Sequence, residues 1–118
     1  MYRLGIDLGG TNIAAGVVDG ENRIVANRKT RVPCTPKEIC GQLSQAAPEA
    51  LGNAGLGIGD VPYVGVGTPG TVNRNTGVVE YANNLYLHHF PLAALLSKRL
   101  RRDVIVENDA NAAAYGEY

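Results

Sequence analysis

The sequence predicts an α/β fold built on a five-stranded mixed sheet with helices on its faces. Short β-branched or apolar runs are typical of strands, and two longer segments carry apolar residues at helical spacing. Three strands come first and then alternate with helices, so the predicted order is βββαβαβα. The first three strands form an antiparallel meander, and two right-handed crossovers add two parallel strands.

The meander is predicted from three strands separated by two turn signals. The strands are residues 1–7, 13–18 and 23–28. Gly9 and Gly10 can take positive φ angles in the first turn, and Asp19-Gly20 is a strong hairpin dipeptide in the second.

A helix is predicted to start at Thr35, which can act as the N-cap, with Pro36 at the first helical position and Glu38 completing a capping box. The apolar residues with helical spacing are Ile39, Leu43, Ala46, Ala47, Ala50 and Leu51. A proline inside a helix removes a hydrogen bond, so we expect Pro48 to kink or break the helix near Ala47.

The second half of the chain supplies the two remaining strands and another helix. The predicted elements are a buried strand over 61–67, a small hairpin over 71–82, an irregular stretch over 85–90, a helix over 91–100 and a strand over 104–108. An alanine-rich helix follows, and the chain ends within it at Tyr118. We therefore expect the chain to be one part of a longer protein.

Composition points to one soluble domain with a small-molecule partner. The chain has 118 residues, 45% of them hydrophobic, and a formal net charge of zero. This balance gives no electrostatic signal for nucleic acid or a membrane surface, and no apolar run suits a membrane helix or signal peptide. We expect a cytoplasmic protein. The spacing of Cys34 and Cys40 fits neither a zinc site nor a redox pair, so both are expected to be free thiols.

Two acids follow predicted strands and suggest one site. Asp7 ends the first strand and Asp109 follows the last, and ligands bind at the carboxyl ends of the parallel strands in open α/β sheets. Gly9-Gly10-Thr11 can present backbone N–H groups to phosphate, and the neighbouring Asp7 suits Mg²⁺, directly or through water. The simpler alternatives are an ordinary hairpin for this turn and a helix cap for Asn108-Asp109.

Three motifs together resemble the N-terminal lobe of the ROK family, which comprises bacterial sugar kinases and related repressors of the actin/hexokinase superfamily. The motifs are residues 7–13, 65–70 and 107–113. The resemblance implies that residues 1–118 form one actin-like ATPase (ribonuclease H-like) lobe, with the C-terminal lobe absent from this chain. It also implies ATP-dependent phosphorylation of a hexose or N-acylhexosamine, with the isolated lobe inactive.

The resemblance also implies residue roles. Asp109 would be the catalytic base, and Asp7 would lie near Mg²⁺. The loop that touches the ATP phosphates would contain Gly9, Gly10, Thr11 and Asn12. The sugar contacts of this lobe would be Gly70, Asn83 or Asn84, and Asn108.

Some family features lie outside the motifs. The family's zinc-binding cysteine cluster belongs to the second lobe, and Cys34 and Cys40 do not match it. Many members carry a tryptophan shortly after the Asn-Leu pair, whereas this chain has none. The sequence therefore does not identify which sugar is bound. His88 and His89 are residues of a type that often binds metals, but a solvated loop is the simpler interpretation.

Two other functions remain as alternatives to the kinase. A sugar-sensing repressor of the same family would carry a helix-turn-helix before the lobe, whereas the first strand here begins at Tyr2. A non-enzymatic actin-like module would not need Asp109. We also expect a homo-oligomer, and self-association of this chain through apolar surface left exposed without the second lobe. A concentration-independent monomer mass in sedimentation would contradict this.

Overall fold

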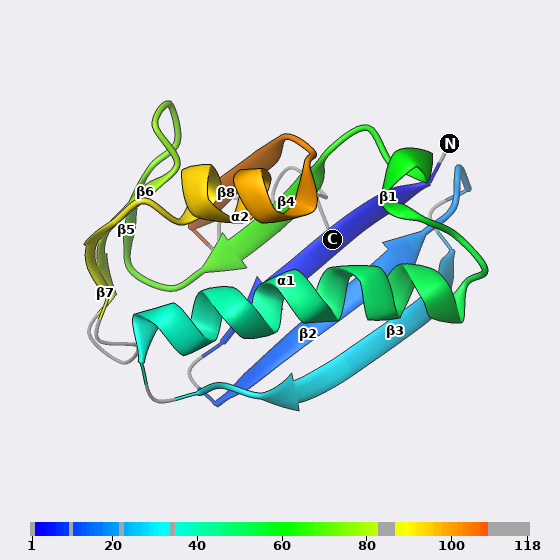
Figure 1. Ribbon diagram of the computed structural model, residues 1–118, viewed down its shortest axis with the longest axis horizontal. Helices are drawn as coiled ribbons and strands as arrows, with labels where there is room; N and C mark the ends of the chain where they lie inside the picture. The colour runs from blue at the N-terminus through cyan, green and yellow to red at the C-terminus, as the bar shows by residue number, and fades with distance from the viewer. Residues whose placement is uncertain (1, 10, 22, 34, 83–86, 109–118) are drawn as a thin grey trace.

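The computed structural model describes residues 2–9, 11–21, 23–33, 35–82 and 87–108 (Figure 1). These residues form strands, two α-helices and one short 3-10 helix. In chain order the elements are β1 (Arg3–Leu8), β2 (Asn12–Val18), β3 (Ile24–Arg31), α1 (Pro36–Asn53), η1 (Ile58–Asp60), β4 (Val64–Thr68), β5 (Thr71–Asn73), β6 (Val78–Ala82), β7 (Leu87–Phe90), α2 (Leu92–Leu100) and β8 (Val104–Asn108).

The predicted five-stranded mixed sheet is confirmed. Its strand order is β3-β2-β1-β4-β8. The pairs β1–β2 and β2–β3 are antiparallel, as expected for a meander, whereas β4 pairs in parallel with both β1 and β8. A second, three-stranded sheet has the order β5-β6-β7 and lies beyond the carboxyl end of β4 (Figure 1).

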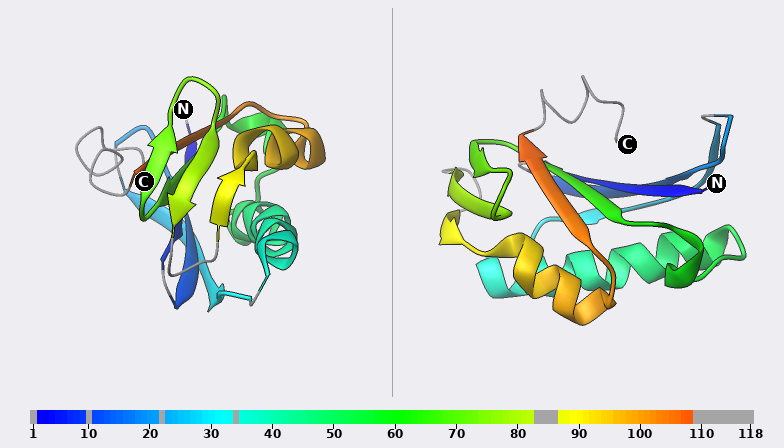
Figure 2. Two further views of the ribbon diagram at one scale, coloured as in Figure 1. Left: turned by 90° about the vertical axis from the view of Figure 1, so that its left-hand side faces the viewer. Right: turned by 90° about the horizontal axis from the view of Figure 1, so that it is seen from above.

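Both described helices cover the same face of the large sheet (Figure 2). Helix α1 contacts β1, β2 and β3, and α2 contacts β8 and α1. Alternate residues of β1 point into this layer, so Leu4, Ile6 and Leu8 are buried there. The intervening residues of β1, Gly5 and Asp7, therefore belong to the opposite face.

The stretch with both histidines is more regular than predicted. Residues Leu87–Phe90 form β7, which pairs antiparallel with β6, with Val79 opposite Phe90 and Tyr81 opposite His88. The prediction of an irregular stretch was wrong for residues 87–90, because pairing with β6 makes them a strand, whereas residues 85 and 86 lie outside the described residues. His89 has a φ of 49°, and its Nδ1 lies 2.7 Å from the Glu80 carboxylate. Both histidines are solvent-exposed, as expected.

Helix α1 begins as predicted but does not break. The Thr35 hydroxyl accepts a hydrogen bond from the Glu38 N–H at 3.2 Å and donates one to the Glu38 carboxylate at 2.9 Å. The helix then continues through Pro48 to Asn53 (Figure 1). Pro48 is exposed, whereas Ala47 and Ala50 are fully buried on the sheet. Packing on both sides of the proline therefore holds the helix together where local propensity opposes it.

Replacing Pro48 with alanine is expected to raise the free energy of unfolding by about 1 to 3 kcal/mol, because alanine supplies the missing N–H for the Ser44 carbonyl. Urea denaturation measures the change. The matched control is Gln45→Ala, an exposed substitution one turn earlier, which should change the same quantity by less than about 0.5 kcal/mol. An unchanged or lower stability of Pro48→Ala would contradict this account.

The described surface carries a few large apolar side chains. They are Tyr2, Ile24, Val25, Tyr81 and Leu95. Self-association through these side chains stays a prediction. Among the described residues, no helix has the length and apolar character needed to cross a membrane.

Candidate functional site

The parallel strands bring the predicted site residues to one edge of the large sheet. Strands β1, β4 and β8 run in the same direction, so their carboxyl ends meet there. Asp7 is opposite Gly67 in the register, and Thr68 is opposite Asn108. Asp7 and Asn108, which are about one hundred positions apart in the sequence, therefore flank the end of the same central strand.

Asn108 and Gly70 form a direct link across this edge. The Asn108 amide Nδ2 donates a hydrogen bond of 2.7 Å to the Gly70 carbonyl oxygen. Gly70 has a φ of 92°, a backbone conformation that residues with a side chain rarely adopt. A Cβ atom at this position would also overlap the Tyr81 carbonyl oxygen, and backbone cannot move aside easily. Glycine is thus required here for both conformation and space.

The β1–β2 turn is held by its own hydrogen bonds. The Gly9 N–H donates to the Asn12 carbonyl at 2.9 Å, and Asn12 Nδ2 donates to the Thr11 hydroxyl at 3.1 Å. The Val32 N–H donates to the Thr11 carbonyl at 3.0 Å, which ties the turn to the end of β3. The Gly9 N–H is therefore engaged within the turn, whereas the Thr11 side chain is exposed at its tip.

Among the described residues at this edge, Asp7 is an acid whose side chain can bind a metal ion. It is partly exposed, and its carboxylate makes no hydrogen bond or ion pair with the described residues. No group of three or more His, Cys, Asp or Glu side chains gathers within the described ranges. A single carboxylate fits Mg²⁺, which keeps several waters and takes its remaining ligands from substrate phosphates. The donor set of the described residues therefore suggests neither a zinc site nor a calcium site.

Four of the predicted site residues lie outside the described residues. They are Gly10, Asn83, Asn84 and Asp109. Their roles stay predictions from the sequence. Asp109 directly follows Asn108, the last residue of β8.

Two charged residues beside the site were not predicted from the sequence. Glu107 is buried in β8, one residue before Asn108, and Arg74 reaches it from the β5–β6 turn to form an ion pair. In the register Asp7, Gly67 and Glu107 occupy one row across the sheet. The available signal was an acid inside an otherwise apolar strand, but its partner could not be identified because the hairpin lies far away in sequence.

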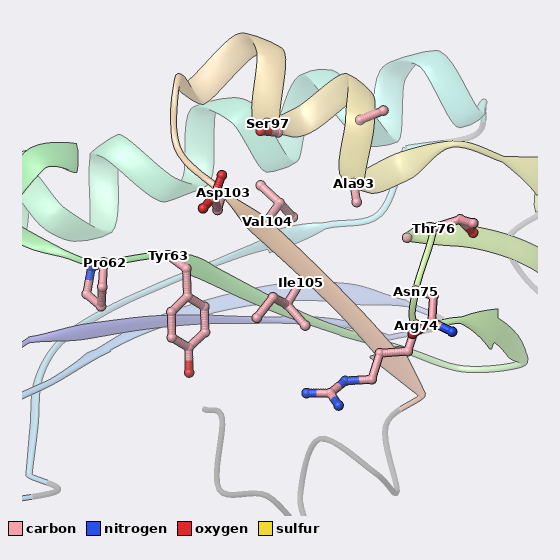
Figure 3. A pocket seen from close by; sticks show the side chains of 12 residues that line it. Pro62, Tyr63, Arg74, Asn75, Thr76, Ala93, Ser97, Asp103, Val104 and Ile105 are labelled. Carbon is pink, nitrogen blue, oxygen red and sulfur yellow. The ribbon is translucent and has the colours of Figure 1, made fainter.

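A cavity of about 560 Å³ lies around the amino-terminal half of β8, between α2 and the β5–β6 turn (Figure 3). Its lining includes Asp103 and Ile105 of the strand region, Ser97 of α2 and Asn75 of the turn. The predicted site residues lie at the opposite, carboxyl end of β8 and do not line it. We therefore place the candidate site at the carboxyl ends of the strands, where ligands bind in open α/β sheets, and not in this cavity.

An α/β lobe built on a five-stranded mixed sheet, with its helices packed on that sheet, is the fold found in the actin-like sugar kinases. The ROK family profile matches residues 3–118, and the chain belongs to the ROK family.

Named relatives of the chain are sugar kinases. Over 116 residues it is 41% identical to a glucokinase from Streptomyces coelicolor, covering 98% of this chain and 35% of that protein. Over 113 residues it is 40% identical to an N-acetyl-D-glucosamine kinase from Salmonella arizonae, covering 96% of this chain and 36% of that protein. The chain thus spans about a third of the length of these relatives.

The fold also matches a solved ROK family glucokinase from Streptomyces griseus, in complex with glucose and AMPPNP. The TM-score is 0.89 and the identity is 42%, over 100% of this chain and 36% of the other. This likeness confirms the actin-like fold that the three motifs predicted.

Proposed function

We propose that this chain is the N-terminal lobe of a two-lobed kinase that transfers the γ-phosphate of ATP to a hydroxyl of a hexose or N-acylhexosamine. The observation that carries the proposal is the meeting of Asp7, the Gly70 loop and Asn108 at one sheet edge, in a chain about 40% identical to a glucokinase and an N-acetyl-D-glucosamine kinase. These relatives differ in the sugar that their names state, so the proposal includes both sugar classes.

The phosphate side of the site would be the β1–β2 turn. Its exposed Thr11, with Gly10 and Asn12, would contact the phosphates of ATP, because a tight glycine turn lets phosphate oxygens approach the backbone. Since the Gly9 N–H is engaged with Asn12, the contribution of Gly9 would be the shape of the turn. Asp7 would hold Mg²⁺ directly or through water, and the bound ion would neutralise charge on the transferred phosphate.

The sugar side would be the Gly70 loop and the end of β8. Asn108 would contact a sugar hydroxyl beside the reacting one, with its amide oriented by the bond to Gly70. Gly70 and Asn83 or Asn84 would complete the contacts of this lobe. Asp109 would accept the proton of the attacking hydroxyl as the new O–P bond forms and the bond to the ADP oxygen breaks. The sequence predicts a helix directly after Asp109, and an acid at the start of a helix would be favoured in its ionised form, which suits a base.

Positioning accounts for most of the catalysis in phosphoryl transfer, so both lobes of the protein are needed. The adenosine contacts, the structural zinc and further sugar contacts would belong to the second lobe. The 118-residue chain expressed alone is therefore expected to bind sugar or phosphate weakly and to release no ADP.

The first test is sugar-dependent ADP release by the full-length protein with Mg²⁺ and ATP. Glucose, N-acetylglucosamine, N-acetylmannosamine and fructose would be compared, with the 118-residue chain assayed beside it. ADP release with one of these sugars supports the kinase and identifies its substrate. No sugar-dependent ADP from the full-length protein would contradict the kinase and favour a sugar sensor or an actin-like module, and turnover by the short chain would contradict the need for a second lobe.

A further inference from the structure

Glu107 is a charged side chain buried at the junction between the two parts of the proposed sugar site. Its side chain is 1% exposed, and neither carboxylate oxygen has a hydrogen-bond donor of suitable geometry among the described residues. Val106 before it is buried in the core under the helices, so Glu107 projects from the opposite face of the sheet. Burying a carboxylate is costly unless an opposite charge is placed beside it.

The counter-charge comes from the hairpin. Arg74, in the turn between β5 and β6, places its Nε against Glu107 Oε1 as an ion pair, while more than half of the Arg74 side chain stays exposed. Arg74 extends from the turn to the side of the sheet away from α2 (Figure 3). A partly exposed guanidinium thus neutralises a buried acid, and one end of the pair belongs to each part of the site.

The hairpin is joined to the end of β8 at two successive residues. Glu107 binds Arg74, and Asn108 donates its 2.7 Å hydrogen bond to Gly70 at the start of the hairpin. Successive residues of a strand point to opposite faces, so these two contacts hold β8 from both sides. The orientation of the loop carrying Gly70 relative to the strand that leads into Asp109 therefore depends on both contacts.

We propose that Arg74 and Glu107 are positioning residues for the sugar: their ion pair fixes the hairpin wall of the sugar site against the Asn108 wall. The inference rests on the proposed sugar kinase function. Neither side chain needs to touch the sugar, because the pair acts through Gly70 and Asn108.

The experiment compares KM for the sugar, KM for ATP and the melting temperature in the full-length protein and its variants, using glucose or whichever of the four sugars gives the most ADP. Arg74→Ala is expected to raise the sugar KM about tenfold or more, with a smaller effect on the ATP KM. The reason is that a small displacement of the hairpin would misplace the groups that contact the sugar. Arg74→Lys keeps the charge and should recover most of the loss.

Two further variants separate the pair from general loss of structure. Adding Glu107→Gln to Arg74→Ala removes the buried charge that Arg74 neutralised, so the double variant should have a lower sugar KM than Arg74→Ala alone. The matched control is Arg28→Ala, which removes another arginine Nε from an ion pair, 2.6 Å from Glu49 and away from the site. The control should leave both KM values within about twofold.

The outcomes for the pair and for the kinase are distinguishable. A sugar KM within about twofold of the unsubstituted value in Arg74→Ala, with only a lower melting temperature, would overturn the positioning role. If the unsubstituted protein binds glucose in calorimetry but releases no ADP, the kinase function fails while the pair is still tested by the Kd for glucose. In that case about tenfold weaker binding by Arg74→Ala supports the pair, and an unchanged Kd overturns it.

Discussion

Replacing Asp109 with asparagine is expected to lower kcat for sugar-dependent ADP release by about 10² to 10⁴-fold, the usual contribution of a general base. Asparagine keeps the size and the capping ability of the side chain but cannot accept the proton from the sugar hydroxyl. The melting temperature and the binding of sugar should therefore change little. Steady-state kinetics of the full-length protein, with calorimetry for sugar binding, measures both quantities.

The matched control for this substitution is Asp103→Asn. Asp103 is an exposed acid directly before β8, so the two substitutions change the same chemical group at opposite ends of one strand. We expect Asp103→Asn to retain kcat within about twofold. An Asp109→Asn variant that keeps its activity would contradict the general-base role, and equal losses in both variants would indicate a general effect of charge near β8.

Replacing Gly70 with alanine is expected to destabilise the protein by about 3 kcal/mol or more and to abolish most of its sugar binding. The φ of 92° is unfavourable for alanine, and the added Cβ would overlap the Tyr81 carbonyl oxygen. The loop must then move, which displaces the carbonyl that Asn108 binds. Urea denaturation measures the stability, and calorimetry with glucose measures the affinity.

Gly55→Ala separates the conformational cost from the overlap. Gly55 has a comparable positive φ of 74°, but a Cβ there would meet nothing within 4 Å. This control should lose only about 1 to 2 kcal/mol and should bind sugar normally. Similar losses of stability in the two variants would show that the overlap at Gly70 is relieved without cost, and normal sugar binding by Gly70→Ala would contradict its place in the sugar site.

The order of the large elements could be predicted from the sequence because each carries a local signal. Asp19-Gly20 marks the β2–β3 turn, Thr35 caps α1, and the apolar run before Asn108 forms β8. The position of Asp7 and Asn108 at one edge also followed, since parallel strands of one sheet place their carboxyl ends together. Local sequence patterns and the general rules of sheet topology are enough to specify these features.

Features that depend on pairing or packing with another element could not be predicted in the same way. Residues Leu87–Phe90 have no strong alternation and become a strand because β6 pairs with them. Pro48 opposes helix locally, yet α1 continues because buried residues on either side of it pack on the sheet. Both described helices lie on one face of the sheet, which the element order alone left open.

The candidate site likewise has features with a local sequence signal and features that depend on tertiary packing. Asp7, the glycine turn and the Asn108-Asp109 pair could be identified from sequence because each motif is contiguous and follows a strand. The bond from Asn108 to Gly70 and the ion pair of Arg74 with Glu107 join residues more than thirty positions apart, so no local pattern encodes them. Their existence depends on how the β5–β6 hairpin folds back over the end of β8, because a buried charge finds its counter-charge only after the chain has packed.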